Sequence, residues 1–83
     1  METISPTQYG LSSRVKLLFK DNSIVIVKQR KSRIIMKDSR QILDIANKIR
    51  VQEHDKKIKL LISGPICSKS IKFLNENNIT VIK

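Results

Sequence analysis

A hairpin pattern over residues 14–28 limits the possible folds of this chain more strongly than any other segment. Apolar and mainly basic side chains alternate along residues 15–20, which places the apolar ones on one face of a strand and the cations on the other. Asp21-Asn22 then supplies two residues that tolerate left-handed backbone angles, and the β-branched residues 23–28 form the return strand. The sequence therefore predicts an antiparallel hairpin with a largely cationic face.

The next segment predicts a third strand followed by a helix. Residues 33–37 (RIIMK) have the composition of a strand. Asp38 has the character of an N-cap, and Gln41, three residues later, completes a capping box for a helix from about residue 39 to 52. Apolar residues recur there at helical spacing, so we expect one face to pack on the core through Ile42, Ile45, Ala46 and Ile49.

The last part of the chain predicts a strand, a helix and a strand. Residues 58–63 (IKLLIS) are apolar enough to form an inner strand packed on both faces. Ser68 is expected to cap a short helix that ends near Asn77, and residues 79–82 form the final strand.

The predicted fold class is α/β, in a single small domain with the order β-β-β-α-β-α-β. Two strand-helix-strand units after a hairpin imply a mixed sheet with right-handed crossover helices. A chain of 83 residues has room for one core. Residues 14–83 form the predicted domain, and residues 1–13, which lack periodicity, are expected to be a flexible N-terminal tail.

Cysteine content and apolar runs give an expectation about the compartment. Cys67 is the single cysteine, which excludes an intramolecular disulfide, and the first residues lack the basic and apolar regions of a secretion signal. The longest apolar runs are far shorter than the roughly 20 residues that a membrane helix needs. We therefore expect an intracellular, cytoplasmic protein that does not contact a membrane.

Positive charge is concentrated between Arg14 and Arg40. This stretch holds nine Lys or Arg residues and two acids, a net charge of +7 out of +10 for the chain. A small basic sheet suits a polyanion, and nucleic acid is the commonest one. Because only three residues are aromatic, backbone contact to duplex DNA or structured RNA is favoured over base stacking. The predicted contact residues are Lys16, Lys20, Lys28, Arg30, Lys31 and Arg33.

The loop that follows residue 62 is a second candidate site. Free amides at the start of a helix, together with Ser68 and Lys69, could hold a phosphate. An ordinary turn with a serine cap is the alternative, and the loop lacks the glycine spacing of a Walker loop. His54 and the acids do not cluster in sequence into a metal or catalytic arrangement. The sequence thus predicts no catalytic residue, no metal, no cofactor and no enzyme activity.

The segment KLLISGPICSKSIKFLNENNITVIK (residues 59–83) resembles the closing strand-helix-strand unit of restriction-endonuclease-like nucleases, the family that includes Mrr-type enzymes and archaeal Holliday-junction resolvases. The order of elements over residues 15–83 follows that family, and the local likeness covers residues 59–82. Such nucleases hold a divalent metal with an acid on the second strand and an acid-x-Lys on the third. Here Ile35-Met36-Lys37 has isoleucine in place of the acid, so the resemblance implies a core without its catalytic acids. The same segment also resembles the N-terminal domain of the CRISPR integrase.

These observations predict a non-enzymatic nucleic-acid-binding protein that contacts phosphate through a cationic hairpin. It would be a small accessory subunit of a DNA replication or repair, transcription or ribonucleoprotein complex. One alternative is a protein-interaction subunit that docks on a larger, acidic partner. Another is a metal-dependent nuclease, active or degenerate. An exposed sheet edge also allows pairing in a homodimer or on a partner.

Overall fold

The computed structural model describes residues 2–29 and 31–82, and these form a small α/β domain. Its strands and helices follow the predicted order β-β-β-α-β-α-β, so the predicted fold class is confirmed. A short 3-10 helix, η1, follows the first strand. The elements are β1 (Glu2–Ile4), η1 (Pro6–Tyr9), β2 (Lys16–Lys20), β3 (Ser23–Lys28), α1 (Met36–Gln52), β4 (Lys57–Ile62), α2 (Ser68–Glu76) and β5 (Ile79–Ile82).

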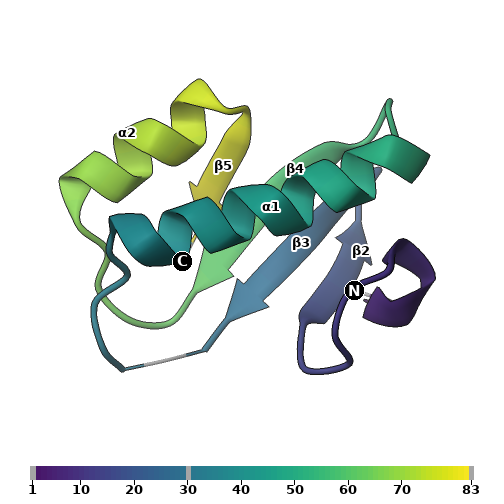
Figure 1. Ribbon diagram of the computed structural model, residues 1–83, viewed down its shortest axis with the longest axis horizontal. Helices are drawn as coiled ribbons and strands as arrows, with labels where there is room; N and C mark the ends of the chain where they lie inside the picture. Colours follow the sequence, from purple (N-terminus) through teal and green to yellow (C-terminus); the bar gives the residue numbers. More distant parts are fainter. Residues whose placement is uncertain (1, 30, 83) are drawn as a thin grey trace.

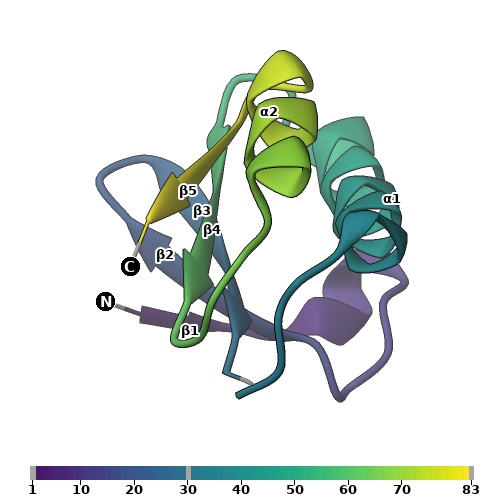
Figure 2. The ribbon, with the colours of Figure 1, turned by 90° about the vertical axis from the view of Figure 1, so that its left-hand side faces the viewer.

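The strands of the described chain form one mixed sheet in the order β1-β2-β3-β4-β5. β1 pairs antiparallel with β2, and β2 with β3, whereas β3, β4 and β5 run parallel to one another. α1 connects β3 to β4 and α2 connects β4 to β5, so both crossovers proceed in the same direction across the sheet. Right-handed crossovers of that kind place their helices on the same face. Figures 1 and 2 show α1 and α2 together on one side of the sheet.

The core lies between the sheet and α1 and α2. Alternate residues of the inner strands point toward the helices, and the helix face predicted from sequence points back at them. Ile45 is half-buried and packs on this core. The fully or almost fully buried members are Leu17, Ile24, Ile26, Ile34, Ile42, Ala46, Ile49, Ile58, Leu60, Ile62, Leu74 and Ile79.

The predicted hairpin is confirmed. β2 and β3 pair in register from Lys16 opposite Val27 to Lys20 opposite Ser23. Asp21 and Asn22 form the two-residue turn with φ of 51° and 61°, in the left-handed region that a tight hairpin of this type requires.

The predicted third strand at residues 33–37 is wrong, because α1 begins at Met36. Within this segment Ile34 makes only an isolated parallel bridge, to Ile66. Asp38 is the third residue of the helix and not its N-cap. Its carboxylate accepts a hydrogen bond from the backbone N–H of Ile35 at 3.0 Å, and the Ser39 hydroxyl donates to the Ile35 carbonyl at 3.2 Å. These two bonds stabilise a helix start three residues earlier than predicted.

The remaining strand of the sheet comes from the first residues, where the sequence predicted a flexible tail. β1 pairs with β2, with Thr3 opposite Leu18. After η1 the side chains of Tyr9 and Leu11 are only 6% and 7% exposed and belong to the core. The side-chain amide of Gln52, at the end of α1, donates to the Gln8 carbonyl at 2.9 Å. Residues 2–11 are therefore attached to the domain through β2 and through the end of α1.

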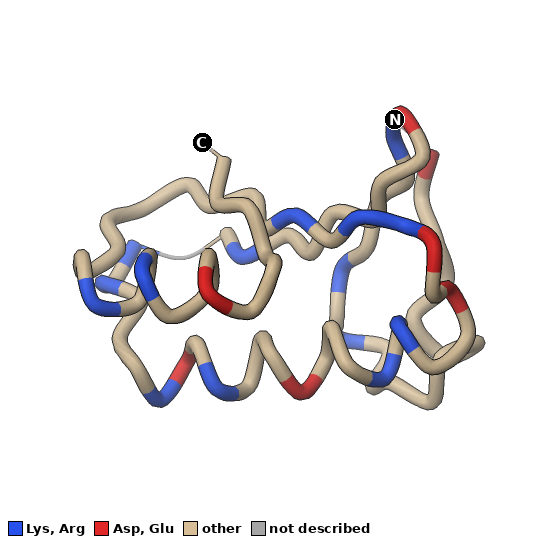
Figure 3. Tube along the Cα trace, turned by 90° about the horizontal axis from the view of Figure 1, so that it is seen from above, with Lys and Arg blue, Asp and Glu red and all other residues tan. Residues whose placement is uncertain are grey.

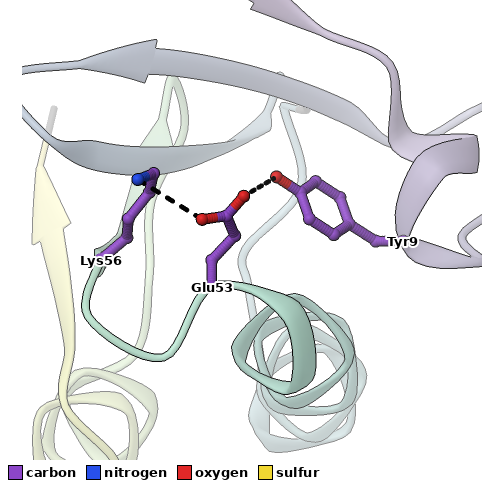
Figure 4. Close-up of polar contacts among 3 residues, drawn as sticks. All are labelled: Tyr9, Glu53 and Lys56. Carbon is purple, nitrogen blue, oxygen red and sulfur yellow. Dashed lines mark hydrogen bonds and ion pairs between the residues drawn. The ribbon is translucent and has the colours of Figure 1, made fainter.

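A polar contact chain adds to this attachment (Figure 4). The Tyr9 hydroxyl donates to Glu53 Oε1 at 3.4 Å, and Lys56 Nζ lies 3.4 Å from Glu53 Oε2. Lys56 Nζ also lies 5.6 Å from the centroid of the Phe19 ring. Glu53 thus connects the N-terminal segment to the loop that precedes β4.

The second helical connection differs from its prediction at one end. Cys67 is the N-cap of α2 and Ser68 its first residue, so Ser68 is not the predicted cap. At the other end α2 stops at Glu76, close to the predicted end near Asn77, and Asn78 has a φ of 60° in the left-handed region before β5. Within the described residues, no helix has the length and apolar character needed to cross a membrane.

Candidate nucleic-acid interface

The basic connection after β3 and the candidate phosphate loop after β4 lie side by side at the edge of the sheet where these two strands end. Because β3 and β4 are parallel, the connections that follow them, residues 29–35 and 63–67, leave from the same edge. The Ile34 N–H donates to the Pro65 carbonyl at 3.0 Å, and the Cys67 N–H donates to the Ile34 carbonyl at 3.2 Å. The basic connection and the candidate phosphate loop are therefore joined by a short parallel bridge.

We call Lys28, Lys31, Arg33 and Lys69 the basic edge. Lys31, Arg33 and Lys69 are exposed. Lys28 is half-buried at the end of β3 and pairs in register with Ile62, a core residue, so it lies on the helix-covered side of the sheet. The predicted contact Arg30 lies outside the described residues.

Both helices begin at the basic edge. The N-terminal ends of α1 and α2 carry the positive ends of their dipoles, which add to the charge of the side chains. The nearby acid Asp38 uses a carboxylate oxygen to accept the Ile35 N–H. This edge therefore has the positive charge that attracts phosphate groups.

The thiol of Cys67 reports on the electrostatics of this edge. Hydrogen bonding to the Ser70 side chain, whose oxygen lies 3.0 Å from the sulfur, is the largest cause of a lowered Cys67 pKa. Backbone hydrogen bonds from Ser70 and Lys69 and the positive charge of Arg33 lower the pKa further, against a partial desolvation that raises it. Arg33 therefore acts across the bridge on the first turn of α2.

Replacing Ser70 with alanine should raise the pKa of Cys67 and slow its alkylation by iodoacetamide. The hydroxyl stabilises the thiolate, and the thiolate is the reacting species, so its fraction at a given pH falls when the hydroxyl is lost. Rates measured between about pH 6 and pH 10 should show the midpoint moving to higher pH. Arg33→Gln should move it in the same direction by less, and Ser68→Ala should not move it. An unchanged midpoint in Ser70→Ala would contradict the hydrogen bond.

The hairpin lysines Lys16 and Lys20 do not belong to the basic edge. In register with Val27 and Ser23, they lie on the face of the sheet opposite α1 and α2. The same face carries Lys57 and Lys59 of β4, because their neighbours Ile58 and Leu60 point into the core. The predicted set of contacts is therefore divided between two surfaces.

Lys57 and Lys59 were missed by the sequence prediction. Residues 58–63 were expected to pack on both faces, whereas α1 and α2 cover only one face of the described sheet. The alternation Lys57-Ile58-Lys59-Leu60 carries a period-two signal that would have identified both lysines as a separate face.

The segment that was compared with the acid-x-Lys motif of the restriction-endonuclease-like nucleases does not lie on a strand. Ile35-Met36-Lys37 lies at the cap and first turn of α1, and Lys37 is exposed there. No group of three or more His, Cys, Asp or Glu side chains within residues 2–29 and 31–82 is arranged to hold a metal ion.

A polar cavity of about 540 Å³ lies at the opposite end of the sheet, near the amino ends of β4 and β5. Arg50 and His54 are among its lining residues. The Arg50 guanidinium donates to the carbonyls of Asn77 and Asn78 at 2.8 and 3.1 Å, and so satisfies acceptors that follow the end of α2. We assign Arg50 a structural role.

Comparisons of this chain with protein-family models, with curated proteins and with solved structures found no match.

Proposed function

We propose that this protein binds nucleic acid without acting on it chemically, and that the basic edge contacts the phosphate backbone. The observation that carries the proposal is the bridge between Ile34 and Ile66, which holds the connection bearing Lys31 and Arg33 beside the first turn of α2. Exposed cations and helix N-termini facing the same side suit successive phosphates. The proposal includes a role as an accessory subunit of a nucleic-acid-processing complex, in which a partner protein would carry out the chemistry.

The aromatic residues support backbone contact over base stacking. Tyr9 is buried in the core, and Phe19 and Phe73 are half-buried and pack against it. Single-stranded sites usually need exposed aromatic rings on which bases stack. Duplex DNA or structured RNA, recognised through phosphate, is therefore the favoured ligand.

The test compares two triple variants that remove the same charge from different surfaces. The edge variant combines Lys31→Gln, Arg33→Gln and Lys69→Gln, and the face variant combines Lys20→Gln, Lys57→Gln and Lys59→Gln. This matched control is needed because Lys and Arg positions are spread over both sheet and helices (Figure 3). Each phosphate contact contributes about 0.9 to the slope of log affinity against log salt concentration. We expect the slope of the edge variant to be about 2.7 less steep, and that of the face variant to stay close to the original.

The measurement is a titration of labelled duplex DNA and of hairpin RNA from about 50 to 200 mM salt, the range over which phosphate contacts change affinity most visibly. Absence of binding by the unmodified protein at the lowest salt would reject the proposed function. Equal losses of slope in both variants would show that affinity follows net charge and would reject the basic edge as the site.

A further inference from the structure

The face of the sheet opposite α1 and α2 carries an aliphatic stripe that crosses from β2 to β5. Leu18 lies opposite Val25, Val27 lies opposite Leu61, and Leu61 lies opposite Ile82. Residues directly opposite in register share a face. We call this surface the open face.

An aliphatic stripe is not what a solvated sheet face normally carries. A sheet packed on one side alternates apolar and polar residues, whereas strands covered on both sides are apolar throughout. Ile24 to Val27 of β3 belong to the second kind, since Val25 and Val27 point away from the core cluster. Neighbouring side chains already leave Val25 and Val27 only 2% and 7% exposed. The sequence of β3 is therefore that of a strand in a sheet with a layer on each face.

Lysines flank the stripe. Lys20 and Lys57 lie on either side of Ser23, Lys59 lies beside Val25, and Lys16 lies beside Val27. Lys59 is half-buried, consistent with a stem that lies along the sheet while its ammonium group reaches water. Among the described strand positions on this face there is no Asp or Glu. The surface is thus an aliphatic stripe with lysines beside its β2 and β3 members and toward the amino ends of β3 and β4.

Charge selects among the molecules that could cover this face. A second copy of the chain would bring its lysines against these lysines, which is unfavourable. Nucleic acid would satisfy the cations, but its charged phosphate backbone offers no apolar surface to the aliphatic stripe. A peptide segment with an apolar stripe and flanking carboxylates satisfies both parts of the surface.

We propose that the open face binds an acidic amphipathic helix of a partner protein. Three inter-strand spacings of about 4.8 Å separate β2 from β5, so the stripe is about 14 Å wide, the length of roughly ten helical residues. Such a helix would place apolar side chains at i, i+3, i+4 and i+7 on the stripe and carboxylates beside Lys20, Lys57 and Lys59. The bound helix would cover the second face of the sheet, as expected for a strand that is apolar on both faces like β3. The surface is separate from the basic edge.

The test uses a synthetic helical peptide of about 14 residues, with Leu at the spacing above and Glu at the flanking positions. Its binding to the full chain labelled with ¹⁵N is followed by amide shifts. Two control peptides replace Glu by Lys, or keep the composition and scramble the Leu spacing. We expect the first peptide to shift amides of β2 to β5, and the two controls to leave them unchanged.

The triple variants from the nucleic-acid test separate the two proposals. The face variant should bind the peptide about tenfold more weakly, since three screened lysine–carboxylate pairs are lost, and the edge variant should bind it normally. The docking proposal is wrong if no shift appears up to about 1 mM peptide, or if the scrambled peptide binds equally well. It is also wrong if anionic phospholipid vesicles or duplex DNA shift this face and the acidic peptide does not.

Discussion

Replacing Tyr9 with alanine should destabilise the domain by about 3–5 kcal/mol, the usual cost of removing a large buried aromatic side chain. Tyr9 is 6% exposed and packs in the core cluster. A domain of this size has a total stability of about 4–12 kcal/mol, so the variant should be partly or largely unfolded at room temperature. Urea denaturation followed by far-ultraviolet circular dichroism measures the loss.

Two further substitutions serve as controls for the loss of the Tyr9 ring: one removes only the hydroxyl, and the other removes an adjacent side chain. Tyr9→Phe keeps the ring and removes only the bond to Glu53, which should cost about 0.5–1.5 kcal/mol. Gln8→Ala changes an exposed neighbouring side chain and should stay within about 0.5 kcal/mol. If Tyr9→Ala is as mild as Gln8→Ala, residues 1–13 behave as the flexible tail predicted from sequence.

The two adjacent leucines of β4 should respond very differently to truncation. Leu60 is fully buried between the sheet and the helices, so Leu60→Ala should cost about 2–5 kcal/mol. Leu61 is half-buried on the open face, and Leu61→Ala should cost about 1 kcal/mol or less. Both values come from the same urea experiment.

The difference between these leucines depends on one face of the sheet being uncovered in solution. Equal losses would contradict that arrangement. A loss for Leu61→Ala that grows with protein concentration would indicate a second copy on the open face, because association adds stability by mass action.

The parts of the fold that depend only on residues close together in the sequence could be predicted. The turn at Asp21-Asn22 needs only two residues that accept positive φ, and the buried face of α1 needs only apolar residues at helical spacing. The hairpin, the two helices and the last two strands followed from these local patterns, whereas β1 did not.

Contacts between distant segments could not be predicted in this way. Residues 33–37 have strand composition, yet Ile34 bridges to Ile66, 32 residues further along the chain, and the helix starts at Met36. β1 has three residues, too few for a period-two pattern to emerge, and it exists because β2 offers a pairing edge.

In the candidate site, too, local features could be predicted from the sequence and long-range contacts could not. Lys28, Lys31 and Arg33 were found by counting charge, and Lys69 was found from its place in the loop before a predicted helix; neither step needs a structure. The arrangement of the basic residues was not found in this way, since the register assigns Lys16 and Lys20 to the open face and the Ile34 bridge joins Arg33 to the first turn of α2. The lysines of β4 were missed because an apolar run concealed their alternation.

The order of strands in the sheet has a consequence for how the domain is assembled. Each strand from β2 onward pairs with the strand that precedes it in the chain, so spatial order equals chain order. During synthesis from the N-terminus, each new strand can dock on one already made. The strand order therefore allows the sheet to grow outward at a single edge, from β1 toward β5, without opening to admit a later strand.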